Sequence, residues 1–336
     1  MTVAIVGVGH TTFRSTTPDV TFKEQMFEAA VKAYEDAGVS PRKDIGSFIT
    51  GAEDYWEGYS IFDEFVPDQL GATLRPVCTI SGDGLQALVT GAMQLETGMF
   101  DVVAVEAHSK ASDMLSFTGI VSHGLDPVYN RSMNISPFFI AGLEMRKYLS
   151  ATRTTREQAA RVVTKNKMNA LDNPIAAHGA KMSIDEVTNS EMVCDPLTRR
   201  DMSPLADGAI VLVLASEKKA KELSENPVWL KGMSWISETP WLESRDWSEA
   251  AYAKTASKKA YKMAGITDPT KQLDLVEVDD WFSYKELQHL EAIGICESGE
   301  AGKLLEKGDF DRNGNMPVNV SGGRIGAGNL LEASSL

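Results

Sequence analysis

Apolar and polar positions along the first third of the chain alternate between patterns typical of strands and of helices. Short apolar runs at Val3–Val8, Ile45–Gly51 and Asp101–Ala107 are typical of buried strands. Between the first two runs, a helical stripe covers Phe22–Ala37 and ends at Gly38, a residue suited to a helix terminus. This order of strand, helix and strand predicts a layered fold in which helices cover a parallel sheet.

The segment 77–98, VCTISGDGLQALVTGAMQLETG, combines a strand end, a tight entry containing glycine, and one helix. Apolar residues recur at helical spacing from Gly84 onward, and small residues leave the neighbouring face nearly free of side chains. Ser81 is the predicted N-cap, with Asp83 in the first turn and Gly98 as the stop. Ser81 would then face unpaired N–H groups that stabilise an anion. A capped core helix without chemistry is the other interpretation.

Residues 110–200 break this rhythm with loops and helices, and we interpret them as an insertion. The strand pattern resumes at Gly208–Ala215. A second α/β unit is then predicted, with strands at Val228–Ile236 and Leu273–Val278 and helices at Glu249–Ala264 and Lys285–Ile293. The predicted domains are an N-terminal half at 1–112 plus 201–222, an inserted loop domain at 113–200, and a C-terminal half at 223–336.

Net charge, apolar runs and cysteine spacing limit which partners and which cellular compartment we expect. The net charge of −14, without a basic run, disfavours nucleic acid and anionic membranes as partners. No run of 18 apolar residues predicts a membrane span, and the N-terminus leads directly into a strand rather than a secretory signal. The three cysteines lack the spacing of a metal site or disulfide framework, so we expect no metal and a reducing cytoplasm.

Several segments, taken together and in this order, resemble the thiolase superfamily. They are GDGLQAL, ETGMFDVVAVEAHSKAS, KNKMNALDNPIAAHGAKMSIDEV, SPLADGAIVLVLAS, VEVDDWFSYKELQHLEAIGIC and PVNVSGGRIGAGNLLEAS. The chain is most similar to sterol-carrier-protein-type thiolases and to archaeal and bacterial acetyl-CoA acetyltransferase-like proteins. The resemblance covers nearly the whole chain and implies a layered αβαβα fold of two similar halves with an inserted loop domain.

The resemblance also implies where a nucleophile would lie. Thiolases place a cysteine at the start of the central helix, because a helix N-terminus lowers the pKa of a thiol. Alignment without gaps puts Ser81 at that position, and serine is a weaker nucleophile without a strong adjacent base. Cys78 lies three residues earlier and would need a local gap to take the role. A small buried apolar side chain is the alternative interpretation of Cys78.

Two further family elements are present in altered form. The turn that builds an oxyanion hole, Asn-Glu-x-Phe or His-Asp-x-Phe, reads Asp279-Asp280-Trp281-Phe282 here. Adjacent acids can act as acid or base, or cap the helix that follows. The family's Gly-Gly loop ends in a catalytic histidine, whereas asparagine stands there in this chain and orients an oxygen without taking a proton. The residues of this loop expected to bind substrate are Gly322, Gly323 and Gly328, followed by Asn329.

Three further residues are candidates for the site, and two of them have an alternative interpretation. His108 follows a strand near the family's site and is expected either to contact substrate or to be hydrogen-bonded at a dimer interface. Phe282 and Tyr284 are expected near the cavity of Asp279, although an aromatic packed in the core is the alternative for Tyr284. The family continues past Ser334 with a helix and a hairpin carrying another cysteine, so we expect the C-terminal half to be truncated or completed by something else.

Three functions follow from this resemblance. The first is an acyl-CoA acyltransferase of the acetyl-CoA acetyltransferase type, with an altered catalytic set. The second is a retro-aldolase that uses Asp279, Asp280 or Tyr284 as acid and base. The third is a non-catalytic subunit that binds CoA thioesters. In each case coenzyme A enters as a substrate thioester, with no separate cofactor.

The resemblance extends to partners and assembly. A zinc-ribbon and OB-fold protein of the DUF35 type, or a second thiolase-fold enzyme, is an expected partner. We also expect a homodimer or higher oligomer that pairs through the Asp101–Ala107 strand. Because strand ends and helix N-termini collect ligands in this fold class, Ser81, Asp279 and Asn329 are expected to share one crevice.

Overall fold

The computed structural model describes residues 2–239 and 241–336. The chain forms two compact units. Unit 1 contains Met1–Met114, Leu205–Met233 and Leu330–Leu336, and unit 2 contains Leu115–Pro204 and Ser234–Asn329. The prediction of an α/β fold is confirmed. The assignment of the segments to thiolase halves stays a prediction.

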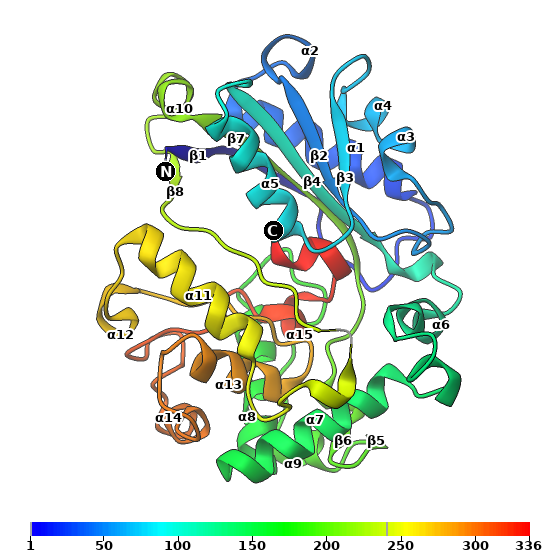
Figure 1. The fold of residues 1–336 in the computed structure, drawn as a ribbon, viewed down its shortest axis with the longest axis vertical. Helices are drawn as coiled ribbons and strands as arrows, with labels where there is room; N and C mark the ends of the chain where they lie inside the picture. The colour runs from blue at the N-terminus through cyan, green and yellow to red at the C-terminus, as the bar shows by residue number, and fades with distance from the viewer. Residues whose placement is uncertain (1, 240) are drawn as a thin grey trace. The chain divides into compact units, whose positions relative to one another are not determined.

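A six-stranded sheet forms the centre of unit 1 (Figure 1). Its order is β3 (Val77–Ile80), β2 (Ser47–Gly51), β4 (Val102–Lys110), β7 (Asp207–Ser216), β1 (Val3–His10) and β8 (Val228–Leu230). β2 is parallel to β3 and β4, whereas β7 is antiparallel to both β4 and β1. The expected parallel sheet is therefore mixed, because β7 and β8 run opposite to the other four strands.

Two strand predictions are corrected by this topology. The strand predicted at Val228–Ile236 is short and pairs antiparallel with Val3–Ile5 of β1, so it extends the sheet of unit 1. The strand predicted at Asp101–Ala107 is β4, which is hydrogen-bonded on both sides and has no free edge for pairing across a two-fold axis. The strand with a free edge next to β2 is β3. The oligomeric state itself stays a prediction.

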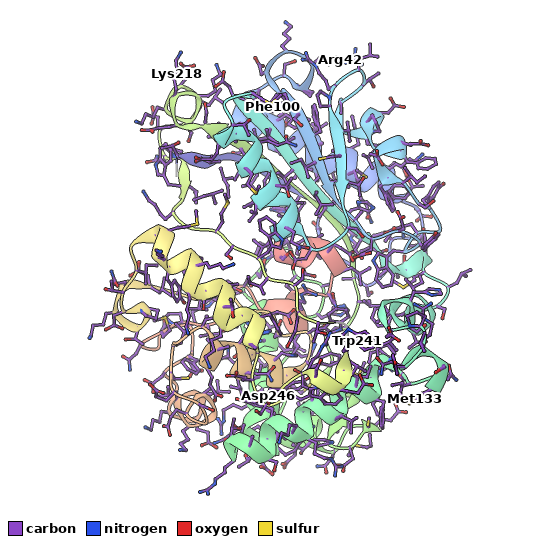
Figure 2. All side chains as sticks on the ribbon, in the orientation of Figure 1. Arg42, Phe100, Met133, Lys218, Trp241 and Asp246 are labelled. Atoms are coloured by element: carbon purple, nitrogen blue, oxygen red, sulfur yellow. The ribbon has the colours of Figure 1, made fainter. Side chains whose placement is uncertain are left out.

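Helices cover both faces of this sheet. α1 (Phe22–Ala37) begins with a capping box between Thr21 and Glu24 and ends at Gly38 with φ 65°. Its small apolar face packs on alternate residues of β1, β4 and β7. α5 (Gly84–Glu96) covers the opposite face, where a Cβ at Gly91 would lie 2.9 Å from Val105. After α5, Phe100, labelled in Figure 2, packs so closely that a Cβ at Gly46 would lie 2.6 Å from its ring.

Unit 2 is mainly helical and surrounds α8 (Arg156–Ala170). Helices α13 (Ser283–Ala292), α14 (Ala301–Lys307), α15 (Gly323–Ala327) and α9 (Ile184–Thr188) pack against α8. The strand predicted at Leu273–Val278 is reduced to one parallel bridge between Val276 and Val318. α7 (Pro137–Thr152) contacts a short hairpin of β5 (Met192–Cys194) and β6 (Leu197–Thr198).

The remaining helices are short, apart from α11 (Ala251–Ala264), which packs on α13. They are α2 (Pro41–Asp44), α3 (Phe62–Phe65), α4 (Pro67–Leu70), α6 (Phe117–Val121), α10 (Glu217–Leu223) and α12 (Pro269–Gln272). In the described part of the chain, each helix is too short or too polar to cross a bilayer.

Candidate active site

The entrance to α5 differs from the predicted one. Ser81 is exposed two residues before the N-cap, and its Oγ donates a hydrogen bond to Glu53 Oε2 at 2.9 Å. The cap is Asp83, whose carboxylate accepts from the backbone N–H of Gln86 at 3.1 Å. The prediction that Ser81 caps this helix is therefore wrong. Asp83 has the extended backbone of an N-cap and a carboxylate that the dipole stabilises.

The first turn of α5 is also covered by the segment Leu330–Leu336. Ser335 Oγ accepts from the backbone N–H of Leu85 at 3.1 Å. A Cβ at Gly84 would lie 2.5 Å from Leu336 Cγ and 3.0 Å from the carbonyl oxygen of Glu332. Within unit 1, the backbone N–H groups of Leu85 and Gln86 at this helix start thus already have partners in Ser335 and Asp83.

Cys78 lies in β3, the strand that precedes α5 in the chain. Its Sγ is 3.9 Å from Gln94 Nε2, and the residue is partly buried. Burial raises the pKa of the Cys78 thiol above its ordinary value, which disfavours the thiolate that attacks an acyl group. Its role as a nucleophile stays a hypothesis, and its surroundings fit the alternative of a small buried side chain better.

His108 is enclosed within unit 1, on the face of β4 that α1 covers. Its Nδ1 lies 2.9 Å from Glu106 Oε1, and its Nε2 lies 3.8 Å from Glu57 Oε1. The ring stacks on Phe22 with centroids 5.2 Å apart. Burial opposes protonation, but the Glu106 and Glu57 carboxylates outweigh it and raise the pKa of His108 to about 9. His108 is therefore a buried cation inside its own chain, held by acidic neighbours.

In unit 2, the neighbours Asp279 and Asp280 have different surroundings. Asp280 is fully buried and accepts from Asn166 Nδ2 at 2.8 Å and from the backbone N–H groups of Arg324 at 2.6 Å and Ile325 at 3.2 Å. Burial, together with the Glu286 and Asp279 carboxylates, raises the pKa of Asp280 to about 7. Asp280 thus holds the first turn of α15, where its carboxyl replaces a helix cap.

The loop that contains Gly322, Gly323 and Gly328 packs closely against Asp280 and α8. Gly322, Gly323 and Gly328 all have positive φ angles, of 107°, 56° and 121°. A Cβ at Gly323 would lie 2.4 Å from Asp280 Oδ2, and one at Gly322 would lie 2.6 Å from the Cβ of Ala170 in α8. These two glycines therefore allow close packing between α15 and its neighbours. Their expected contacts with substrate stay a prediction.

Asp279 is the more accessible acid of the pair. Its side chain is 35% exposed, and its Oδ1 lies 2.9 Å from Arg324 Nε. The Arg324 guanidinium lies over the Trp281 ring, 5.5 Å from its centroid. Burial opposes ionisation, but Arg324 above all outweighs it and lowers the pKa of Asp279. Asp279 is consequently an ionised, partly exposed carboxylate that is paired with Arg324.

Next to Asp279, four side chains form a hydrogen-bonded chain that the sequence did not reveal. Lys285 Nζ donates to Glu144 Oε1 at 2.5 Å and to Tyr252 Oη at 3.4 Å. Tyr252 Oη lies 2.7 Å from His289 Nε2, and His289 Nδ1 lies 3.0 Å from the carbonyl oxygen of Asp279. Burial and the positive charge of Lys285 lower the pKa of His289, so the imidazole is neutral.

The donor and acceptor groups of these four side chains fix the direction of the hydrogen bonds that His289 makes. Since a carbonyl accepts only, His289 carries its proton on Nδ1, and Tyr252 donates to Nε2. The one available signal was the spacing of Lys285 and His289, which share a face of α13 at i and i+4. Glu144 and Tyr252 come from α7 and α11, so neither could be associated with α13 from local pattern.

Two aromatic candidates belong to the packing beside this chain. Tyr284 is fully buried and donates to Glu144 Oε2 at 2.9 Å. Burial, with the Glu144 carboxylate, raises the pKa of Tyr284 well above its ordinary value, so its alternative reading as a packed aromatic fits better than a role as base. Phe282 stacks between Tyr284 and Trp281, with centroids 6.1 Å from each.

Asn329 is fully buried in unit 2. Its Nδ2 lies 3.0 Å from Ser203 Oγ, and its backbone N–H donates to the carbonyl of Pro204 at 2.8 Å. Asp279 and Asn329 belong to unit 2 and Ser81 belongs to unit 1. The expectation that the three share one crevice therefore stays a prediction.

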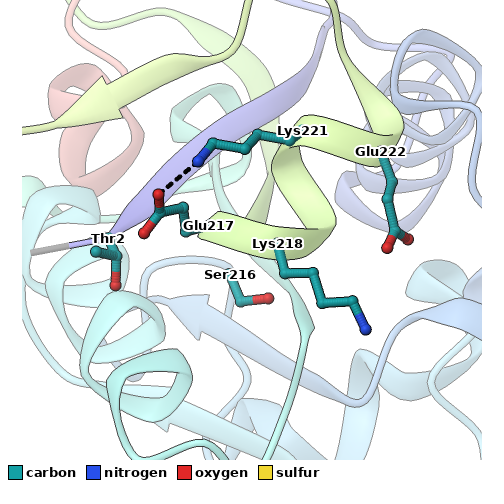
Figure 3. Close-up of a pocket in the computed structure, with 6 residues that line it drawn as sticks. All are labelled: Thr2, Ser216, Glu217, Lys218, Lys221 and Glu222. Carbon is teal, nitrogen blue, oxygen red and sulfur yellow. Dashed lines mark hydrogen bonds and ion pairs between the residues drawn. The ribbon is translucent and has the colours of Figure 1, made fainter.

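A further surface hollow lies in unit 1, at the start of α10. Its volume is about 680 Å³, and it is lined by Thr2, Ser216 and four charged residues, of which Lys221 and Glu217 pair at 2.6 Å (Figure 3). Its charges neutralise each other at the surface. Among residues 2–239 and 241–336, no group of three or more His, Cys, Asp or Glu side chains has the geometry to hold a metal ion.

Comparisons with known proteins give the site a context. Residues 236–336 match the family model for thiolase C-terminal domain-like sequences. The chain is 32% identical to an acetyl-CoA acetyltransferase of Methanothermobacter thermautotrophicus, over 99% of this chain and 88% of that relative. It is 29% identical to sterol carrier protein 2 of Gallus gallus, over 99% of this chain and 64% of that relative.

Solved structures show the same fold. The structure of the Ltp2-ChsH2(DUF35) aldolase matches with a TM-score of 0.83 at 22% identity, covering 96% of this chain and 85% of the other. A monomeric SCP2-thiolase-like protein type 1 from Mycobacterium smegmatis matches with a TM-score of 0.69 at 20% identity, covering 96% of this chain and 66% of the other.

Proposed function

The chain belongs to the thiolase superfamily, and from this premise we propose that it cleaves a carbon–carbon bond of a β-hydroxyacyl-CoA thioester by a retro-aldol reaction. The observation that carries the proposal is the contrast between two side chains. Burial keeps the Cys78 thiol protonated, whereas the Asp279 carboxylate is ionised and accessible. This contrast supports acid–base chemistry over covalent chemistry through a thiolate.

The proposed step balances without a further reactant. Asp279 takes the proton from the β-hydroxyl, the new carbonyl forms at the β carbon, and the bond between the α and β carbons breaks. The electron pair moves into the thioester enolate, which then takes a proton at the α carbon. The products are a shorter acyl-CoA and an aldehyde or ketone. Arg324 keeps Asp279 ionised. His289, the last of the four hydrogen-bonded side chains, donates to the backbone carbonyl of Asp279 and holds it in position.

The aldolase neighbour supports this reading at the level of fold, and its DUF35 component motivates a proposed partner of that type. Acyl transfer is the second candidate function, and the 32% identity to the acetyl-CoA acetyltransferase of Methanothermobacter thermautotrophicus favours it. Binding of a CoA thioester is common to both candidates. A non-catalytic scaffold remains the third reading of the same fold.

The experiment is an activity assay on β-hydroxybutyryl-CoA with the wild type and the Asp279→Asn variant. The wild type should release acetyl-CoA and acetaldehyde, and D279N should lower kcat by about 100-fold or more, the usual worth of a general base. Asp274→Asn is the matched control, since Asp274 is an exposed acid five residues earlier. Formation of acetoacetyl-CoA from acetyl-CoA at an undiminished rate in D279N would favour acyl transfer instead.

A further inference from the structure

A small polar pocket lies in unit 1 at the approach to α1, on residues that play no part in the proposed reaction. Its volume is about 280 Å³, and it is open on one side. The lining residues that matter are Thr16, Thr17, Arg14, Asp19, Gln25 and Glu28. This volume is at the small end of the range for ligand pockets, which limits an occupant to a small molecule.

Gln25 carries the clearest sign of a missing partner. The residue is 3% exposed and lines the pocket, and its Oε1 has no hydrogen-bond partner among the described residues. Its Nε2 donates to Thr17 Oγ1 at 2.9 Å. Thr17 gives its own hydroxyl proton to Asp207 Oδ2 at 2.7 Å, so its oxygen must accept from Gln25. The amide orientation is thereby fixed, and a residue that lines the pocket is left with a buried acceptor that has no donor among the described residues.

The frame around Gln25 is rigid. Asp207 Oδ2 accepts from the backbone N–H of Thr17 at 2.8 Å, from Lys110 Nζ at 3.0 Å and from Ser112 Oγ at 2.7 Å. Lys110 Nζ also donates to the carbonyl of Thr17 at 2.9 Å. Because Thr17 is held at both its backbone and its hydroxyl, the oxygen that accepts from Gln25 Nε2 is fixed in place. A buried acceptor without a donor destabilises the fold unless something binds it.

The rim of the pocket carries both signs of charge. Within the described residues, the Arg14 guanidinium is exposed and has no ion pair or side-chain hydrogen bond. Asp19 and Glu28 contribute carboxylates, and Glu28 pairs with Lys32 at 2.6 Å outside the lining. A lone anion would meet these acids, and a lone cation would meet Arg14. A molecule carrying both charges satisfies the two sides at once.

We propose that this pocket binds a small zwitterion of the amino-acid class. The ligand's carboxylate would pair with Arg14, for which a planar guanidinium is suited. Its ammonium would donate to Gln25 Oε1 and face the Asp19 and Glu28 carboxylates. Exposed hydroxyls such as that of Thr16 are available for a short polar side chain.

The test uses L-serine and two molecules that each lack one of its charges: ethanolamine, without the carboxylate, and β-hydroxypropionate, without the ammonium. Each is titrated into the full-length protein and followed by amide NMR shifts. L-serine should cause saturable shifts in residues 11–20 and 25–28, and each half-ligand should bind at least ~10-fold more weakly, a loss of about 1.4 kcal/mol. Equal binding of all three, or no shift with L-serine, would overturn the proposal.

Two variants complete the test. Arg14→Gln changes an exposed side chain, so the fold should persist while L-serine binding falls at least ~10-fold. Gln25→Met keeps the length of the side chain and removes the acceptor, and its thermal unfolding is measured alongside binding. Unchanged L-serine affinity in R14Q, or a crystal of the protein with L-serine that shows only water on Gln25 Oε1, would contradict the site.

Discussion

Replacing His108 by glutamine tests the buried cation of unit 1 through the pH dependence of stability. The pKa of His108 rises from an unfolded value near 6.5 to about 9 in the fold, because the Glu106 and Glu57 carboxylates outweigh its burial. Glu332 is the third acid that acts on the ring. Since the folded protein binds this proton more tightly, His108 stabilises the fold fully below about pH 6.5, and the contribution is lost as the pH rises through about 9.

The size of this effect follows from the shift. A difference of 2.5 units at 1.36 kcal/mol per unit corresponds to about 3 kcal/mol for this fully buried ring. Urea unfolding at pH 6 and pH 10 should therefore show that the wild type loses about 3 kcal/mol more than His108→Gln over this interval. Groups remote from His108 contribute equally to both proteins and cancel in the comparison, whereas Glu57 and Glu332 interact with the ring and make the difference smaller. His123→Gln, at an exposed position in unit 2, is the control and should behave as the wild type.

An equal loss of stability in the wild type and H108Q would refute the reasoning, because the imidazole would then be neutral in the folded state. A larger loss in H108Q would refute it as well, since the sign of the linkage would be reversed. Glutamine retains a donor that can reach Glu106, so the variant at pH 10 should unfold with ordinary cooperativity.

Three further predictions concern the loop, the thiol and the assembly. Gly323→Ala should destabilise the protein by roughly 1–3 kcal/mol more than Gly98→Ala in urea unfolding, because both positions have positive φ but only Gly323 would place a Cβ against Asp280; equal losses would contradict the packing. Iodoacetamide at pH 7 should label Cys78 slowly, since burial raises its pKa, and peptide mapping that shows rapid labelling would reverse this assignment. Light scattering should give a dimer or larger species, and a stable 36.6 kDa monomer at micromolar concentration would count against it.

Local pattern predicted the elements of unit 1 closely, because their signals are contained in short segments. The helix Phe22–Ala37 and its stop at Gly38 have the predicted bounds. The second helix was also predicted from Gly84 onward and spans Gly84–Glu96, although its cap is Asp83 and not Ser81. The hydrophobic pattern could not predict which strands pair with one another. The run at Val228 has the composition of a strand, but its partner β1 is more than two hundred residues away.

The sequence identified candidate site residues by their type. It could not predict roles that depend on which side chains lie next to them in the folded protein. Asp279 and Asp280 are identical in type, yet Arg324 lowers the pKa of the partly exposed Asp279, while burial and the nearby Glu286 raise the pKa of Asp280 to about 7. The cap of α5 moved from Ser81 to Asp83, because both residues are good caps and only backbone conformation distinguishes them. The chain from Glu144 to His289 joins three helices, so only folding brings it together.

The central claim is that the reaction proceeds without a covalent acyl-enzyme, and intact-protein mass spectrometry after incubation with acetyl-CoA and acid quenching tests it most directly. We predict an unmodified protein mass under conditions in which β-hydroxybutyryl-CoA is cleaved, because the proposed reaction uses Asp279 as its base and the N–H groups of Leu85 and Gln86 at the start of α5 already have partners. A stable acetyl group mapped to Cys78 or Ser81 would contradict the account.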